Sequence, residues 1–172
     1  MKRYCITDSL DVVRRALDLD TAMIQIRAKE LSGRALYRLV EKAVAIAGKR
    51  IIVNTRADVA VVCGAGGVHL PSNSPIAPFR SRFSPPFLIG SSCHTIGELE
   101  EAEREGADFA VFGPVFASPG KGEPVGLAAL REAAESARIP VYALGGITAE
   151  NEALCAEAGA QGIAGIRFFL AG

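Results

Sequence analysis

Short apolar runs alternate with amphipathic segments along most of the chain, an order typical of parallel β/α folds. Helical spacing of apolar residues predicts helices that begin near residues 9, 32, 57, 95, 127 and 148. Ser32, Thr95 and Thr148 are the predicted N-caps of three of them, and the helix that Thr95 opens is predicted to end near Gly106. Eight runs rich in Val, Ile, Leu and Ala predict strands at residues 3–7, 23–27, 51–54, 68–70, 87–91, 109–113, 140–144 and 163–166. Eight strands separated by helices favour a closed parallel barrel, and a doubly wound open sheet is the alternative.

Two segments depart from this alternation. Five prolines between Pro71 and Pro86 oppose a long helix, so we predict a loop there with at most one helical turn. The residues after the eighth strand leave no room for another helix, and Phe168, Phe169 and Leu170 are predicted to cover barrel surface or form a subunit contact. We therefore expect one compact (β/α)8 TIM-barrel domain over residues 1–172, with the fourth helix reduced and the eighth missing.

Composition narrows the function classes. Lys plus Arg and Asp plus Glu both number 19, which gives a formal net charge of zero and argues against nucleic acid or a membrane surface as partner. We expect no signal peptide, because no long apolar stretch follows Met1-Lys2-Arg3, and the four cysteines form no CxxC pair. We expect a cytoplasmic protein with reduced thiols, whose partner is a small phosphorylated metabolite and which can form a homo-oligomer.

A cationic strand end is the first candidate site. The period of two along a strand places Gln25, Arg27 and Lys29 on one side, the interior of a barrel, for as long as the strand lasts. Buried charge is costly without a partner. At the carboxyl end of the strand, the two cations can hold a polyanion and the glutamine amide can orient a ring. A solvated strand end with ordinary ion pairs is the alternative.

Glycines after the last two predicted strands form the second candidate site. Gly145, Gly146 and Gly165 allow the backbone to approach a ligand closely, and backbone N–H groups there favour an anion. In barrels a phosphate commonly lies in the loops after strands seven and eight. We predict a phosphate clamp at Gly145, Gly146, Gly165 and Ile166, to which Arg167 can add charge; ordinary tight turns are the alternative.

Further candidates lie in a loop and at the histidines. Residues 112–122 are rich in Gly, Pro and Ser and are typical of an active-site lid, in which Lys121 can reach a diphosphate. His69 and His94 can act as general acids or bases, although each can equally be structural. Cys93 is the weaker candidate for a nucleophile.

The chain resembles the thiamine phosphate synthase/TenI family over nearly its whole length. No single stretch is decisive, and the ordered set is specific to the family. The stretches that carry the resemblance are Ile6-Thr-Asp8, Gln25-x-Arg27-x-Lys29, Val53-Asn54-x-Arg56-Ala-Asp58, Gly67-Val-His-Leu70, Ile89-Gly-Ser-Ser-Cys-His94, Glu103 to Gly106-Ala-Asp108, Phe112-Gly-Pro-Val-Phe116 and Ala143-Leu-Gly-Gly-Ile-Thr148.

The resemblance implies a barrel and two known activities. The synthase branch joins a hydroxymethylpyrimidine diphosphate to a thiazole phosphate with Mg²⁺, releasing diphosphate. The TenI branch includes thiazole tautomerases. The resemblance implies that the pyrimidine diphosphate is held by Gln25, Arg27, Lys29 and Asn54, that Ser92 follows strand five, that Lys121 is the lid lysine, and that the phosphate is clamped at Gly145, Gly146, Gly165 and Ile166.

Departures from the family pattern affect both activities. Thr55 stands where the synthase has an aspartate that binds Mg²⁺, and Ser74 lies where a second acidic ligand is expected. The resemblance implies Mg²⁺ as the cofactor, but a hydroxyl is a poor substitute for an anionic oxygen ligand of Mg²⁺, so no metal ligand is predicted in this chain. Pro114 stands where the tautomerases have a histidine, and Arg167 replaces a small hydroxyl residue.

Three functions fit these residues. The first is a TenI-like enzyme of thiazole phosphate metabolism in which His94, Cys93 or Lys29 moves protons. The second is a thiamine phosphate synthase, a transferase, with an altered metal site. The third is a catalytically degenerate binding or regulatory protein.

Overall fold

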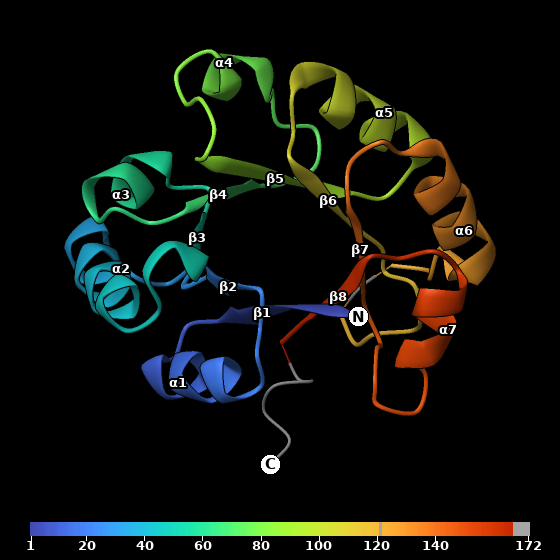
Figure 1. The fold of residues 1–172 in the computed structure, drawn as a ribbon, viewed down its shortest axis with the longest axis horizontal. Coiled ribbons are helices and arrows are strands. Elements are labelled where there is room, and N and C mark those ends of the chain that lie inside the picture. The colour runs from blue at the N-terminus through green and yellow to red at the C-terminus, as the bar shows by residue number, and fades with distance from the viewer. Residues whose placement is uncertain (121, 167–172) are drawn as a thin grey trace.

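The computed structural model describes residues 1–120 and 122–166, and these residues form a closed barrel with helices outside it (Figure 1). The strands are β1 (Lys2–Thr7), β2 (Met23–Ile26), β3 (Ile51–Asn54), β4 (Gly67–Leu70), β5 (Leu88–Cys93), β6 (Phe109–Phe112), β7 (Val141–Leu144) and β8 (Gly162–Gly165). The helices are α1 (Leu10–Asp18), α2 (Gly33–Ala47), the 3₁₀ turn η1 (Gly48–Arg50), α3 (Ala57–Val62), α4 (Ala77–Arg80), α5 (Ile96–Glu105), α6 (Gly126–Ser136) and α7 (Glu152–Glu157).

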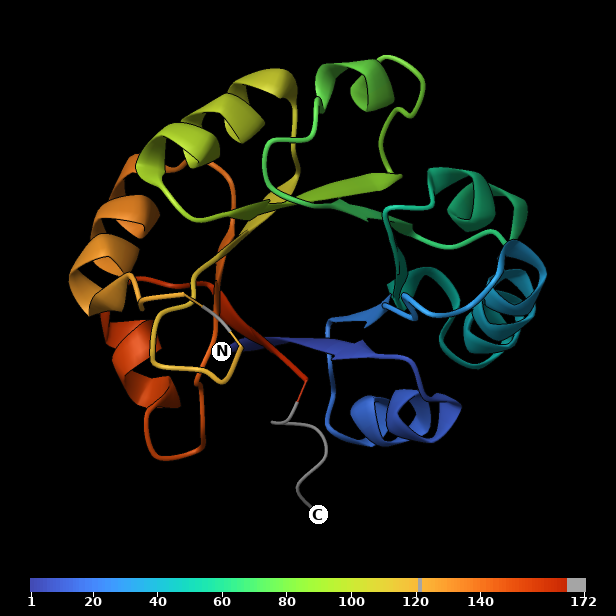
Figure 2. The same cartoon turned by 180° about the vertical axis from the view of Figure 1, so that it is seen from behind.

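Every strand pairs in parallel with its sequence neighbour, and β1 closes the ring against β8. The predicted parallel barrel is therefore confirmed and the open sheet is excluded. Strands β2, β4 and β6 are buried along their whole length, because one face meets the interior and the other meets helices. The reverse view shows the same ring from its other end (Figure 2).

Aromatic rings fill the barrel interior. Tyr4, Phe109 and Tyr142 contact one another edge to face, with ring centroids 5.5–6.0 Å apart. Neighbouring strands contribute glycines where these rings need room. A Cβ atom at Gly90 would overlap the Phe109 ring, and one at Gly162 would lie 2.5 Å from Tyr142 Cε1. The inside of the barrel is therefore a packed core at the level of these rings.

Helix boundaries follow local capping chemistry at some positions and not at others. Thr95 accepts a hydrogen bond from Glu98 N, and Gly106 ends α5 in the left-handed conformation, as predicted. Ser32 precedes α2 as predicted, but its side chain makes no capping bond. The prediction that Thr148 caps the seventh helix is wrong. Asn151 precedes α7 instead, and its Oδ1 accepts from Thr148 N.

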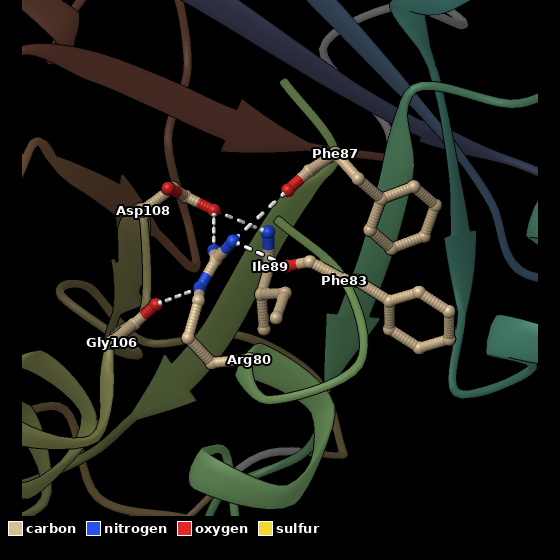
Figure 3. A network of polar contacts seen from close by, with 6 residues as sticks. All are labelled: Arg80, Phe83, Phe87, Ile89, Gly106 and Asp108. Atoms are coloured by element: carbon tan, nitrogen blue, oxygen red, sulfur yellow. Dashed lines mark hydrogen bonds and ion pairs between the residues drawn. The ribbon is translucent and has the colours of Figure 1, made fainter. Parts of the chain in front are cut away.

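The proline-rich segment forms the single-turn helix α4, so the predicted reduction of the fourth helix is confirmed. One side chain fastens this short helix to the barrel (Figure 3). Arg80 donates to the carbonyl oxygens of Gly106, Phe83 and Phe87 and forms an ion pair with Asp108. Asp108 also accepts from Ile89 N at 2.7 Å. This Arg80 network joins the start of β5 to the loop before β6, at the end of the barrel where strands begin.

The described residues omit residue 121 and end just beyond β8 at Ile166. The predictions for Lys121, for Arg167, for Phe168–Leu170 and for the missing eighth helix therefore lie outside them. Within the described part of the chain, no helix is long and apolar enough to cross a membrane.

Candidate functional site

The predicted site residues lie where the strands end, around one mouth of the barrel. Strand β2 ends at Ile26, so Lys29 belongs to an exposed turn and not to the strand. Arg27 is half-buried, directly after the strand. The other predicted residues at this mouth are Asn54, Ser92, His94, Gly145, Gly146, Gly165 and Ile166.

A chain of hydrogen bonds runs from the buried interior to the mouth. Gln25 Nε2 donates to Tyr4 Oη at 2.8 Å, and Tyr4 Oη lies 3.2 Å from His69 Nδ1. His69 Nε2 lies 2.9 Å from Ser92 Oγ. If Tyr4 donates to Nδ1, the neutral imidazole carries its proton on Nε2 and donates to Ser92. Gln25 is thus engaged inside the barrel, and Ser92 is the half-buried end of the chain.

Burial decides the protonation state of His69. Desolvation, with a smaller contribution from the positive charge of Arg27, lowers the pKa of His69 to about 4. Neutral imidazole is therefore the form that the barrel holds at physiological pH. His69 is therefore a buried structural residue, and its contact with Ser92 Oγ connects it to the mouth.

Because the pKa of His69 is lower in the folded chain than the ordinary value of about 6.5, acid favours the unfolded state. We expect this contribution to stability to be complete above pH 6.5 and to be lost as the pH falls towards 4, by up to about 1.4 kcal/mol per pH unit. The measurement is the free energy of unfolding against pH for wild type and His69→Asn. A difference between the two that stays constant from pH 7 to pH 4 would contradict a neutral His69.

The predicted phosphate clamp lines a single cavity. Gly145 and Gly146 follow β7, Gly165 ends β8 and Ile166 follows it; all four line a space of about 370 Å³. Ala117, Ser118 and Pro119 of the predicted lid loop lie across it. Gly145 and Gly146 have φ angles of 100° and 64°, which favour glycine. The two late turns therefore line one cavity, and phosphate binding there stays a prediction.

A second cavity of about 220 Å³ adjoins the first through Ile166. Arg27, Asp8 and Thr7 line it. Among residues 1–120 and 122–166, neither Arg27 nor Asp8 has an ion-pair partner. The cationic strand end and the glycine clamp thus face neighbouring cavities at the same mouth, an arrangement suited to a ligand with two anionic ends or to two anionic ligands.

His94 lies between β5 and β6. Its Nδ1 contacts the carbonyl oxygen of Gly113, which can only accept, so Nδ1 carries a proton. Its backbone N–H donates to Glu98 Oε2. In the neutral side chain Nε2 is then an available acceptor. Cys93, by contrast, is fully buried, and burial raises its pKa to about 11, which removes it as a nucleophile at neutral pH.

The expected magnesium positions carry no suitable donors. Thr55 Oγ1 donates to the carbonyl oxygen of its neighbour Asn54. Ser74 shares a pocket of about 210 Å³ with Glu98 and Glu105, but these carboxylates already accept backbone N–H groups. Within the described residues, no group of three His, Cys, Asp or Glu side chains could hold a metal ion. The side chains at these positions therefore do not fit Mg²⁺.

Thr55 has a φ angle of 61°, which is strained for a β-branched residue. We expect Thr55→Asn to raise the free energy of unfolding by about 0.5–1 kcal/mol, because asparagine tolerates this conformation. Urea unfolding measures the effect. Thr55→Val is the matched control, since it keeps the branch and removes the hydroxyl, and we expect it to gain nothing. A Thr55→Asn protein less stable than wild type would contradict strain at this position.

The sequence did not single out Tyr4 and Asp8 as site residues. Tyr4 lies 65 positions from His69 in the chain, and only the closed barrel brings their side chains together. Asp8 follows the first strand directly, and a charged residue directly after a barrel strand is a signal that could have identified it as a site residue.

Comparison with known proteins places this site in a family. A family model described as thiamine monophosphate synthase matches residues 2–169. A putative thiamine-phosphate synthase 2 of Aquifex aeolicus is 40% identical over 97% of this chain and 96% of its own length. A thiamine-phosphate synthase of Chlorobium luteolum is 44% identical over 92% of this chain and 78% of its own.

Solved structures agree with the sequence matches. A thiamine phosphate pyrophosphorylase from Pyrococcus furiosus superposes with a TM-score of 0.87 at 34% identity, covering 96% of this chain and 85% of the other. The strand order, the cavities at the strand ends and the family match all agree. This chain belongs to the thiamine monophosphate synthase family.

Proposed function

We propose that this protein is a thiamine-phosphate synthase that binds a thiazole phosphate in the cavity of about 370 Å³. The observation that carries the proposal is the convergence of Gly145, Gly146, Gly165 and Ile166 on that cavity. Four neighbouring backbone positions without bulky polar side chains favour a phosphate bound through main-chain N–H groups. The names of the sequence relatives favour the synthase over the other activity of the family.

The proposed reaction is a substitution at the methylene carbon of the pyrimidine diphosphate. The thiazole nitrogen attacks this carbon, the new C–N bond forms, and the C–O bond to diphosphate breaks with its electron pair leaving on oxygen. Arg27 and Lys29 supply positive charge for the departing group. Asn54 and Ser92 lie at the same mouth and can orient the pyrimidine diphosphate.

In this proposal the protein's own cations stabilise the leaving diphosphate, since the side chains at the magnesium positions are Thr55 and Ser74. Lys121 of the lid loop belongs to the same proposed set. Arg167, the next residue in sequence after Ile166, is proposed as an additional charge for the thiazole phosphate. The proposed role of Gln25 is indirect: its amide donates to Tyr4, and so it positions the chain that leads to Ser92.

A second candidate is a TenI-like enzyme that acts on the thiazole phosphate alone. Two observations together favour it. Thr55 and Ser74 stand at the two positions where the synthase has carboxylates, and His94 Nε2 is an available acceptor at the mouth. His94 would accept a proton from the ring carbon and return it at another position.

Only the synthase uses a second substrate, the pyrimidine diphosphate, and this difference allows a test. Purified protein is incubated with thiazole phosphate and pyrimidine diphosphate, with Mg²⁺ or with EDTA, and thiamine phosphate is measured. Formation of thiamine phosphate supports the synthase. No product together with conversion of the thiazole tautomer supports the second candidate. Calorimetric binding of thiazole phosphate without either reaction supports a binding protein.

A pair of arginine variants adds a site-specific test. We expect Arg27→Met to lower kcat by roughly 10- to 100-fold, because the leaving diphosphate loses a cation. Arg38→Met is the matched control, since Arg38 is exposed on α2 and lines neither of the two cavities at the mouth. Equal loss in both variants would contradict the proposed role of Arg27.

A further inference from the structure

Charge is divided unevenly between the two halves of the chain. Residues 1–86 contain 14 Lys and Arg and 7 Asp and Glu, whereas residues 87–172 contain 5 and 12. The zero net charge therefore conceals two half-barrels of opposite sign. Because sequence order follows the ring, these halves lie on opposite sides of the molecule (Figure 1).

The positive charge is concentrated on one side of α2. Arg34, Arg38 and Lys42 recur at intervals of four residues, which places them on one side of the helix. They line a groove of about 380 Å³ between α1 and α2, whose remaining walls include Leu10 and Leu39. All three cations are exposed, and none has an ion pair with another described residue. We call Arg34, Arg38 and Lys42 the basic face.

The negative charge is concentrated on the opposite helices. Helices α5, α6 and α7 together contain nine Glu and two Arg. Glu100, Glu132, Glu135 and Glu157 are exposed and lack an ion pair within the described chain. We call these four residues the acidic face. Figures 1 and 2 both show α2 across the barrel from α6, so the two faces of one molecule cannot meet.

We propose that the basic face of one copy docks on the acidic face of a second copy, head to tail. Charge complementarity selects this occupant, since the chain itself carries the acidic complement of its groove, and copies with no net charge do not repel one another. A contact between two different faces is heterologous, so it continues into a ring or an open chain. The faces lie on the sides of the barrel, which leaves the mouth open to substrate.

The strength of this contact depends on salt. Exposed ion pairs are individually weak, about 0–1 kcal/mol each, and are screened beyond about 10 Å at 0.1 M salt. We therefore expect association at about 10 mM salt, where screening extends to about 30 Å, and dissociation at about 1 M. In sedimentation equilibrium the wild type then has a mass above 18.0 kDa at low salt and returns to 18.0 kDa at high salt.

Two charge-reversed variants test the pairing of the faces. The basic-face variant carries Arg34→Glu, Arg38→Glu and Lys42→Glu, and the acidic-face variant carries Glu100→Lys, Glu132→Lys and Glu135→Lys. Each alone is expected to stay monomeric at low salt, because its two faces then have the same sign. An equal mixture of the two is expected to associate again. Arg82→Glu, an exposed reversal outside both faces, is expected to associate like the wild type.

Circular dichroism establishes that each variant is folded. A wild type that stays at 18.0 kDa at low salt would overturn the proposal, and so would assembly that 1 M salt leaves intact. Failure of two folded variants to associate when mixed would also overturn it. If the acidic-face variant still associates, a different face is in use and the pairing is wrong.

Discussion

Gly146→Val is expected to weaken the binding of thiazole phosphate by roughly 10- to 150-fold, equivalent to losing one charge-assisted hydrogen bond of about 1.5–3 kcal/mol. A Cβ atom at Gly146 would lie 2.5 Å from the carbonyl oxygen of Ala117 and 2.7 Å from Phe116 Cβ. The lid loop or the turn after β7 must therefore move. In the proposed site, the backbone N–H groups of the clamp would then no longer donate together to one bound phosphate. Calorimetry with thiazole phosphate measures the effect.

Gly64→Val is the matched control for this substitution. Gly64 has a similar φ angle of 71°, but a Cβ atom there meets no atom within 4 Å. Both variants carry the same backbone strain, and only Gly146→Val disturbs the cavity. If the wild type and Gly146→Val bound thiazole phosphate with equal affinity, the proposed phosphate clamp would be contradicted. Equal losses in both valine variants would attribute the effect to general destabilisation.

Arg80→Met is expected to lower the free energy of unfolding by about 2–4 kcal/mol. The substitution keeps much of the apolar stem but leaves Asp108 without its cation and three carbonyl oxygens without their donor. Both side chains of the pair are largely shielded from solvent, with 21% and 27% of their area exposed, so water replaces the lost contacts poorly. Urea unfolding followed by circular dichroism measures the loss.

Arg82→Met is the control, because Arg82 is exposed and lies two residues away. We expect it to change stability by less than about 0.5 kcal/mol. Arg80→Lys should recover little of the loss, since one ammonium group cannot reach the positions that the branched guanidinium bonds (Figure 3). An Arg80→Met protein as stable as Arg82→Met would show that the Arg80 network does not anchor α4.

Local pattern was enough to predict the barrel, because each strand and helix carries its own periodicity. The prolines correctly predicted that α4 is a single turn, and Thr95 correctly predicted where α5 begins. Thr148 failed as a cap because Asn151, three residues later, accepts from its backbone N–H and delays the helix. The Asn151 side chain makes no capping bond to α7 itself, so the start of this helix is set by the turn between Thr148 and Asn151, which the spacing of polar residues does not specify.

The candidate site was predictable where it depends on strand ends and less so where it depends on distant partners. Gly146 and Gly165 were placed together by the rule for the last two loops of a barrel, and they share a cavity. The environment of His69 depends on Tyr4 and Ser92 from other strands, so its burial and lowered pKa could not be read from its neighbours in sequence. The same holds for Arg80 and Asp108, which are 28 positions apart.

The glycines that make room for interior rings tie the sizes of residues on adjacent strands together. Gly90 of β5 leaves space for Phe109 of β6, and Gly162 of β8 leaves space for Tyr142 of β7. At Gly90 the nearest atoms to an added Cβ atom all belong to the Phe109 ring, so a larger residue at 90 is tolerated only when the residue at 109 becomes smaller, and we expect substitutions at 90 and 109 to occur as compensated couples. Position 162 has no such route, because a Cβ atom there would also lie 2.5 Å from the carbonyl oxygen of Lys2, and we expect it to stay glycine whatever residue occupies 142.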